Sequence, residues 1–271
     1  MEKTLTPTFA VPSFSKRLKS MLGVDFYRLF HTPLFYIMVA ISAIIPAMVL
    51  SMGTMDGGAA LYTNTWNIIA ADTPLYIVRD ISDYANMNMV FIFGGIMVSI
   101  FIGHDYRSGY VKQLFTTHAK KRDYMMSKSI VCAFSMVCMC GAYLVAGSFA
   151  GLITGASMRV NIGSLLVAVL GKMIMSLGWA SLYTFLNVVL RRHFGISIAL
   201  SFFIGTGIPV IGAAALVGNN SALNALLYGS SVNACLSGNL MTLVTCAAVS
   251  VVWTIIYNVL GSAVLACSDV Y

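Results

Sequence analysis

Long apolar runs constrain this chain more than any other feature. A bilayer core about 30 Å thick takes roughly 20 residues of helix to cross, and only a helix satisfies its own backbone groups in lipid. Six stretches have the required length and apolar content, although Asn86 and Asn88 make the second the weakest. They are residues 33–53, 84–103, 129–155, 163–189, 194–217 and 241–266. The sequence therefore predicts an all-α polytopic membrane protein with six transmembrane helices.

The composition agrees with lipid, rather than water, around most of the surface. Only 9% of the 271 residues are charged, whereas a soluble domain keeps roughly a quarter of its residues charged. A net charge of +7 would suit a nucleic-acid-binding protein, but the basic residues fall between apolar runs and not on a water-soluble scaffold. The six cysteines are interpreted as free thiols, because no pair has metal-ligand spacing with a histidine nearby. We expect contact with a lipid bilayer, no nucleic-acid partner and no metal site.

The distribution of lysine and arginine predicts the orientation of the chain. Basic residues gather before the first apolar run, between the second and third runs, and after the fourth. Because cytoplasmic loops carry the excess of lysine and arginine, both termini are expected in the cytoplasm. Residues 54–83 and 218–240 are then extracellular segments. We find no internal repeat, so residues 1–271 are expected to form one transmembrane domain.

Residues 12–32, ahead of the first span, have the pattern of an amphipathic helix. Apolar side chains recur at helical spacing, while Lys16, Arg17 and Lys19 take the other side. This pattern is typical of a helix that lies in the membrane interface, and Pro33 is expected to end it. The alternative is a basic arm surrounded by water.

Residues 104–128, the cytoplasmic segment between the second and third spans, contain a second amphipathic pattern. Apolar and aromatic residues follow one another at spacings i, i+1, i+4 and i+5, which predicts a short helix with one apolar face. That face would suit docking into a groove of another protein. Resting on the membrane surface is an equal alternative. The residues of the face are Tyr110, Val111, Leu114 and Phe115.

The sequence lacks the motifs of nucleotide-binding and hydrolytic enzymes. The one Gly-Lys pair, Gly171-Lys172, is followed by Met173, so there is no GxxxxGK[ST] phosphate loop. There is also no HExxH and no GxSxG. We therefore expect no catalytic residues, and no enzymatic activity in this chain.

Two features inside the spans could serve transport. Lys172 is a charge at membrane depth, and such residues usually mark a pathway; alternatively, the fourth span begins later and Lys172 lies near the headgroups. Gly205, Gly207 and Pro209 interrupt the fifth span, where they form either a hinge or a static kink.

Several of these residues stand where a known family has its motifs. ABC-2 type permeases carry an acidic residue after the second span, then a glycine that opens a short helix, a basic pair, and an Ala/Ser-Lys at the third span. Residues 24–30 also resemble the entry helix of that family. Aspartate replaces the commoner glutamate here, and a lysine precedes the arginine where the family usually has a small residue. The corresponding residues are Asp105, Gly109, Lys121, Arg122, Ser127 and Lys128.

The resemblance implies an ABC-2 type (type V) exporter fold in a bacterial cytoplasmic membrane, similar to Gram-positive exporters of peptides, lantibiotics or drugs. It implies a dimer with a second copy or a related permease, above cytoplasmic ABC ATPase subunits that bind ATP and magnesium. This chain would hold no cofactor, and its Gly109 to Thr117 helix would insert into the ATPase as a coupling helix. The function implied is export of a peptide, lipid-like or drug-like substrate. Residues then assigned to ATPase coupling are Asp105, Arg107, Gly109, Tyr110, Val111, Leu114 and Phe115.

Two other classes of function stay open from the residues alone. A stand-alone secondary transporter or channel would show paired ionisable residues at the midplane or a repeat between halves, and Lys172 alone supports it poorly. A non-transporting membrane protein for assembly or sensing is the third class.

Overall fold

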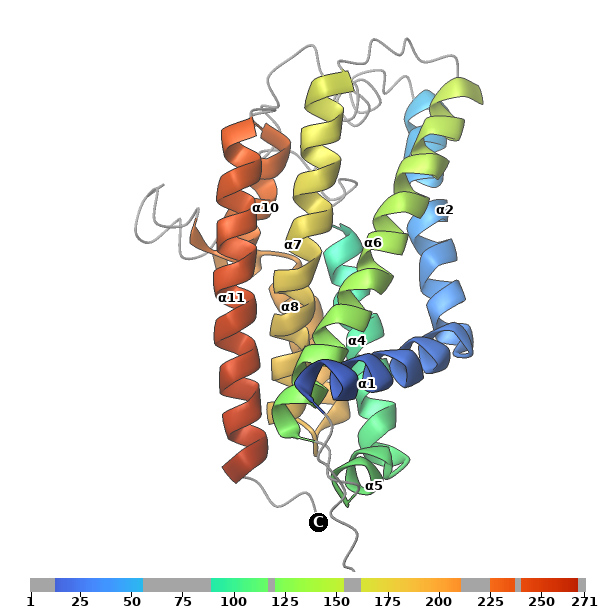
Figure 1. The fold of residues 1–271 in the computed structure, drawn as a ribbon. Helices are drawn as coiled ribbons and strands as arrows, with labels where there is room; N and C mark the ends of the chain where they lie inside the picture. Colours follow the sequence, from blue (N-terminus) through green and yellow to red (C-terminus); the bar gives the residue numbers. More distant parts are fainter. Residues whose placement is uncertain are drawn as a thin grey trace, which may run out of the picture.

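A computed structural model describes residues 13–55, 89–116, 120–153, 162–210, 225–236 and 240–267, and within these ranges the chain folds into a bundle of α-helices (Figure 1). The prediction of an all-α fold is confirmed for this part of the chain. The helices are α1 (Phe14–Phe30), α2 (Pro33–Met55), α4 (Met89–Arg107), α5 (Tyr110–Thr116), α6 (Lys121–Ile153), α7 (Ile162–Val189), α8 (Phe194–Gly205), α10 (Leu227–Leu236) and α11 (Leu240–Cys267).

Four of these helices are long and apolar enough to cross a membrane: α4, α6, α7 and α11. They correspond to the second, third, fourth and sixth predicted spans. The first span would make a fifth if α1 and α2 are taken as one, but the chain bends by 66° between them. The fifth predicted span, residues 194–217, begins as α8, which is only 12 residues long. The described residues thus support four or five spans. Residues 211–217 of the predicted fifth span, residues 56–83 of the first extracellular segment, and residues 218–224 and 237–239 of the second lie outside them.

Helix α1 lies across one end of the bundle, packed against α6, where the sequence predicts an interfacial helix (Figure 1). Its side toward the bundle buries three residues at a spacing of four, Met21, Asp25 and Leu29. The Thr32 hydroxyl donates to the Arg28 carbonyl at 2.7 Å, which closes the end of α1. Pro33 then opens α2, a position where its missing N–H costs nothing.

Helix α7 is the centre of the bundle and contacts α4, α6, α8, α10 and α11. Its Trp179 ring stacks on Phe91 of α4, with centroids 5.2 Å apart. On its other side Ser250 of α11 accepts from the Gly178 N–H at 3.1 Å and donates to a carbonyl of α7. A Cβ on Gly178 would come within 2.7 Å of Leu227. Small residues therefore set how closely these helices pack, as in other membrane bundles.

Polar side chains inside the bundle bond to one another. Asn187 of α7 donates to Ser99 of α4 at 3.1 Å, and it accepts from Ser197 of α8. Ser99 and Ser201 of α8 lie 2.9 Å apart. These bonds hold α4, α7 and α8 together. They also give partners to buried polar groups, which would be costly to leave without a hydrogen bond.

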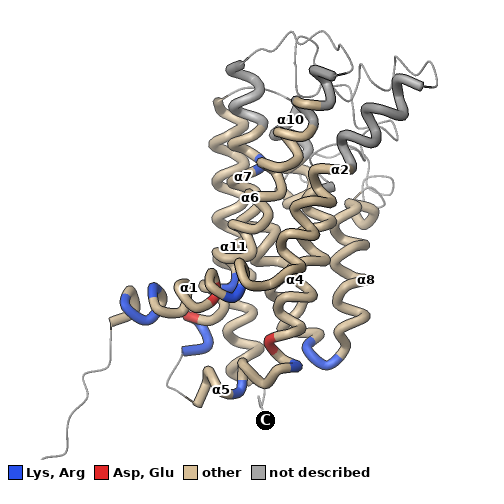
Figure 2. The backbone as a smooth tube through the Cα atoms, turned by 90° about the vertical axis from the view of Figure 1, so that its right-hand side faces the viewer, with Lys and Arg blue, Asp and Glu red and all other residues tan. Residues whose placement is uncertain are grey.

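Most lysines and arginines lie at the end of the bundle that carries α5, which we call the α5 end (Figure 2). They sit on α1, on α5, at the start of α6 and in the turn between α7 and α8. Helix α6 starts at Lys121, eight residues before the predicted third span. The last eight residues of the predicted cytoplasmic segment 104–128 are therefore part of this helix.

Candidate functional site

Four charged residues from three helices meet inside the α5 end, and we call them the buried charge cluster. They are Asp25 and Arg28 of α1, Asp105 of α4 and Lys128 of α6. The Lys128 ammonium lies 2.6 Å from Asp25 Oδ1 and 2.6 Å from Asp105 Oδ2. Arg28 Nη2 lies 2.5 Å from Asp105 Oδ1. Positive and negative groups therefore alternate along the cluster, which has no net formal charge.

Three of the four members of the cluster are closed to solvent, while the Arg28 side chain is 22% exposed. Asp25, Asp105 and Lys128 are each at most 1% exposed. The second oxygen of Asp25 accepts a hydrogen bond from Ser127 at 2.6 Å. Burying an ion costs several kcal/mol unless partners compensate it, and breaking a buried pair costs about 3–5 kcal/mol. The geometry therefore fixes α1, α4 and α6 relative to one another.

A turn brings α5 back over the cluster. Gly109 has φ +72, in the left-handed region where other residues are strained, and this lets the chain reverse between α4 and α5. The Tyr110 ring then lies over the cluster, 4.0 Å from the Arg28 guanidinium carbon and 5.4 Å from the Lys128 ammonium. Phe101 also borders the cluster, with its ring 4.6 Å from that ammonium. Both rings stabilise the cations through their π faces.

Burial raises the pKa of the Tyr110 phenol, and the nearby Asp25 carboxylate adds to this effect, while Lys128 and Arg28 oppose it. The phenol therefore stays neutral at physiological pH. Tyr110 contributes an uncharged ring to the cluster, which leaves its charge balance unchanged.

The apolar face of α5 packs on the chain itself. Val111 is buried, and Leu114 and Phe115 pack against a cluster that includes Tyr124 and Met125 of α6; the Phe115 and Tyr124 rings meet edge to face at 5.7 Å. In this chain the face therefore packs at least in part on its own helices, and its docking into a partner's groove or on the membrane surface stays a prediction. The residues that α5 exposes are Lys112, Gln113 and Thr116.

Two further contacts attach neighbouring helices to the start of α6. Lys121 donates to the Leu265 carbonyl near the end of α11 at 2.5 Å, a favourable place for a cation beside a helix C-terminus. Arg17 of α1 pairs with Asp123 at 2.8 Å. Helix α6 is thus tied by polar contacts to α1, α4 and α11 at the α5 end.

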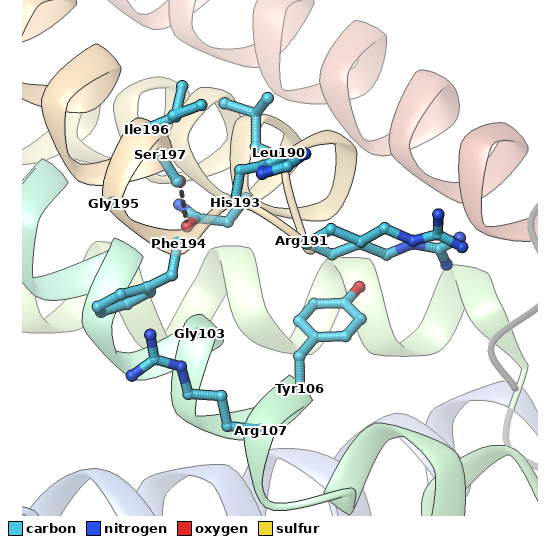
Figure 3. Close-up of a pocket in the computed structure, with 12 residues that line it drawn as sticks. Gly103, Tyr106, Arg107, Leu190, Arg191, His193, Phe194, Gly195, Ile196 and Ser197 are labelled. Carbon is cyan, nitrogen blue, oxygen red and sulfur yellow. Dashed lines mark hydrogen bonds between the residues drawn. The ribbon is translucent and has the colours of Figure 1, made fainter.

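Arg107 does not join the buried charge cluster, although the sequence groups it with the coupling residues. It is exposed at the end of α4, and its guanidinium lies 4.0 Å over the Phe194 ring at the start of α8. Arg107 and Phe194 form walls of two cavities. One, of about 400 Å³, lies between the end of α4 and the α7–α8 turn (Figure 3). The other, of about 550 Å³, lies between the bend after α1 and α4.

The remaining predicted sites lie apart from this end. Lys172 is wholly buried in α7, with its ammonium 5.5 Å from the Phe91 ring centroid; it lines neither cavity. Helix α8 ends at Gly205, and Gly207 adopts φ +73 against the Tyr228 ring. Pro209 follows in a further helical turn. A break is therefore present where the sequence predicts one, and its use as a hinge stays a prediction.

Sequence reasoning missed Asp25 and Arg28 as members of the site. A signal was present, because Asp25 shares the apolar side of α1 with Met21 and Leu29 at spacings of four residues. An acidic residue on an apolar face needs a buried partner.

Across the described residues no group of three or more His, Cys, Asp or Glu side chains is placed to hold a metal ion.

Comparison with known families identifies the family of the chain. A model of the ABC-2 family transporter proteins matches residues 22–208. This range is more than half of the chain, and it holds all four members of the buried charge cluster together with α5. No curated protein matches the chain. The chain belongs to the ABC-2 transporter family.

Proposed function

We propose that this chain is the permease subunit of an ATP-driven exporter, in which separate ATPase subunits supply the energy. Family membership supports a membrane component of an ABC transporter. The full sequence has no phosphate loop of its own, so ATP and magnesium would bind to the partner. The observation that carries the proposal is the buried charge cluster, which joins the short helix α5 to three longer helices.

In this proposal α5 receives motion from the ATPase through its exposed side, Lys112, Gln113 and Thr116. Its buried side, Val111 with Leu114 and Phe115, keeps α5 attached to α6. Tyr110 and the cluster then pass a displacement to α1, α4 and α6. Ion pairs of 2.5–2.6 Å around the buried Asp105 and Lys128 have little room to deform, so the joined helices move as one body.

The α5 end would face the cytoplasm, because lysine and arginine gather there (Figure 2). The chain would work in a bacterial cytoplasmic membrane as a dimer, with a second copy or a related permease. The cargo would be a peptide, a lipid-like molecule or a drug-like molecule. Lys172 would line the pathway, and the break at Gly205 and Gly207 would let the outer part of that segment move.

Recovery of the partner tests the proposal. The tagged full chain, purified from its native membranes, is expected to bring down a protein with a GxxxxGK[ST] loop, identified by peptide mass spectrometry, together with vanadate-sensitive ATP hydrolysis. Changing Lys112 and Gln113 to Glu should abolish both. The matched control changes Lys16 and Lys19 to Glu, exposed residues of α1, and should keep both.

Two results would overturn parts of the proposal. Equal recovery of the ATPase with the Lys112/Gln113 variant would remove α5 as the contact. Substrate transport by vesicles that contain only this chain, without ATP, would instead establish a secondary transporter.

A further inference from the structure

The cavity between the bend after α1 and α4 has an apolar floor and a polar rim, and we call it the elbow cavity. Its volume is about 550 Å³, within the range of pockets that hold small molecules. The floor includes Leu34 at the start of α2, together with Ile100 and Phe101 of α4. His104 and Arg107 line the rim and are exposed, so the cavity reaches the surface of the molecule.

The elbow cavity lies where the membrane-spanning part of the bundle ends. The apolar stretch of α4 runs from Val90 to Arg107, and Ile100 lies seven residues, or about 10 Å, before Arg107. In the first turns of α2, next to the floor residue Leu34, Ile37 is 53% exposed, as befits a side chain that faces lipid. The floor of the cavity is therefore at the depth of acyl chains, while Arg107 is at the depth of headgroups.

The net charge in the elbow cavity comes from Arg107. None of the described residues that line the cavity is acidic. Arg28 also lines it, but Asp105 balances that charge at 2.5 Å. The described carboxylates that form ion pairs are those of Asp25, Asp105 and Asp123, and none of them pairs with Arg107. Within the described part of the chain, Arg107 thus has its charge unmatched by a carboxylate.

Packing holds Arg107 at the rim of the elbow cavity. Its guanidinium carbon lies 4.0 Å from the centroid of the Phe194 ring. Gly103, one turn earlier on α4, leaves room for this ring, because a Cβ at that position would strike it. A guanidinium positioned in this way loses less freedom when it binds an anion, and its planar fork matches the oxygens of a phosphate.

We propose that the elbow cavity binds an anionic phospholipid, with its phosphate on Arg107 and part of an acyl chain on the apolar floor. An inorganic anion would match Arg107 but leave the floor uncovered, and a zwitterionic lipid would bring a second cation close to Arg107. Basic pockets between transmembrane helices bind anionic headgroups in the same way. The proposal concerns the bilayer alone, so it depends neither on export nor on an ATPase.

Lipid binding to the purified full chain tests the proposal. Native mass spectrometry in detergent would compare phosphatidylglycerol with phosphatidylcholine of the same acyl chains, and thermal unfolding would be followed in parallel. Phosphatidylglycerol is expected to bind more tightly and to raise the unfolding temperature more, because a ligand that binds only the folded chain stabilises it. Arg107→Gln should weaken phosphatidylglycerol binding about fivefold or more, since it removes a charge-assisted bond, and should leave phosphatidylcholine binding unchanged.

Arg192→Gln is the matched control. It removes an exposed arginine of the α7–α8 turn that is not among the described residues lining the elbow cavity, and it should keep the wild-type affinity. An Arg107→Gln variant that binds phosphatidylglycerol as tightly as the wild type would overturn the proposal. So would an equal loss of affinity in the two variants, because the lipid would then respond to surface charge in general.

The apolar floor has a test of its own. Leu34→Gln places a polar amide against the acyl chain and should also weaken phosphatidylglycerol binding; unchanged affinity would contradict the placement of the chain. Glycerol phosphate at millimolar concentration, a headgroup without chains, should neither displace the lipid nor raise the unfolding temperature. Displacement would show that the site takes a free anion and would overturn the proposal. If Leu34→Gln does not fold, the comparison with glycerol phosphate carries this part of the test.

Discussion

The last turn of α4 contributes residues to two neighbouring charged regions, which differ in how their charges are arranged and in how far they are exposed to solvent. Asp105 points into the buried charge cluster, where two cations and two anions balance and three of the four residues are at most 1% exposed. Arg107, two residues later, lines a cavity between the end of α4 and the α7–α8 turn together with Arg191, Arg192 and His193, and Arg107, Arg192 and His193 are exposed. A balanced, closed set of charges fixes helices together. Exposed charges that water solvates contribute much less to holding helices together.

The contrast predicts that the buried charge cluster is intolerant of single changes. Lys128→Met keeps the length of the side chain but leaves the Asp25 and Asp105 carboxylates buried without their shared cation. We expect a loss of about 3–5 kcal/mol in unfolding free energy, measured by denaturant unfolding in detergent. Lys120→Met, at an exposed lysine just before α6, is the matched control and should change little. A Lys128 variant as stable as this control would mean that the cluster does not hold the helices together.

Tyr110 tests the contact between α5 and the buried charge cluster. Tyr110→Leu removes the ring over Arg28, and we expect a loss of about 1 kcal/mol in unfolding free energy, together with weaker coupling of ATP hydrolysis to transport. Tyr110→Phe keeps the ring and should retain both, because the phenol is neutral. The comparison is made on purified protein and on reconstituted vesicles. Equal losses in the two variants would assign the effect to the hydroxyl, and not to the ring.

The sequence predicts the elements of this fold better than it predicts how they meet. The helices α4, α6, α7 and α11 are foreseen, because length and apolar content are local properties. The early start of α6 is missed, since Lys121 to Lys128 are polar in sequence and find their partners only in space. Lys121 bonds to the end of α11 and Lys128 to α1 and α4.

The same limit applies to the candidate site. The short helix after Gly109 is foreseen from its spacing, but the surface that its apolar side covers is not. That side meets Tyr124 and Met125, which follow it in the chain by about ten residues and which the sequence assigns to a polar connection. The cavity between the end of α4 and the α7–α8 turn escapes prediction altogether, because only the packing of Phe194 against Gly103 brings Arg107 to that turn.

The smallest effect on stability is expected at Arg107, and this result would sharpen the contrast most. Arg107 is exposed, so Arg107→Gln should change unfolding free energy by no more than about 0.5 kcal/mol in neutral detergent. Denaturant unfolding of the wild type and the variant in the same detergent measures this effect. A large loss would place Arg107 with the residues that hold the fold, and the two regions of α4 would no longer differ.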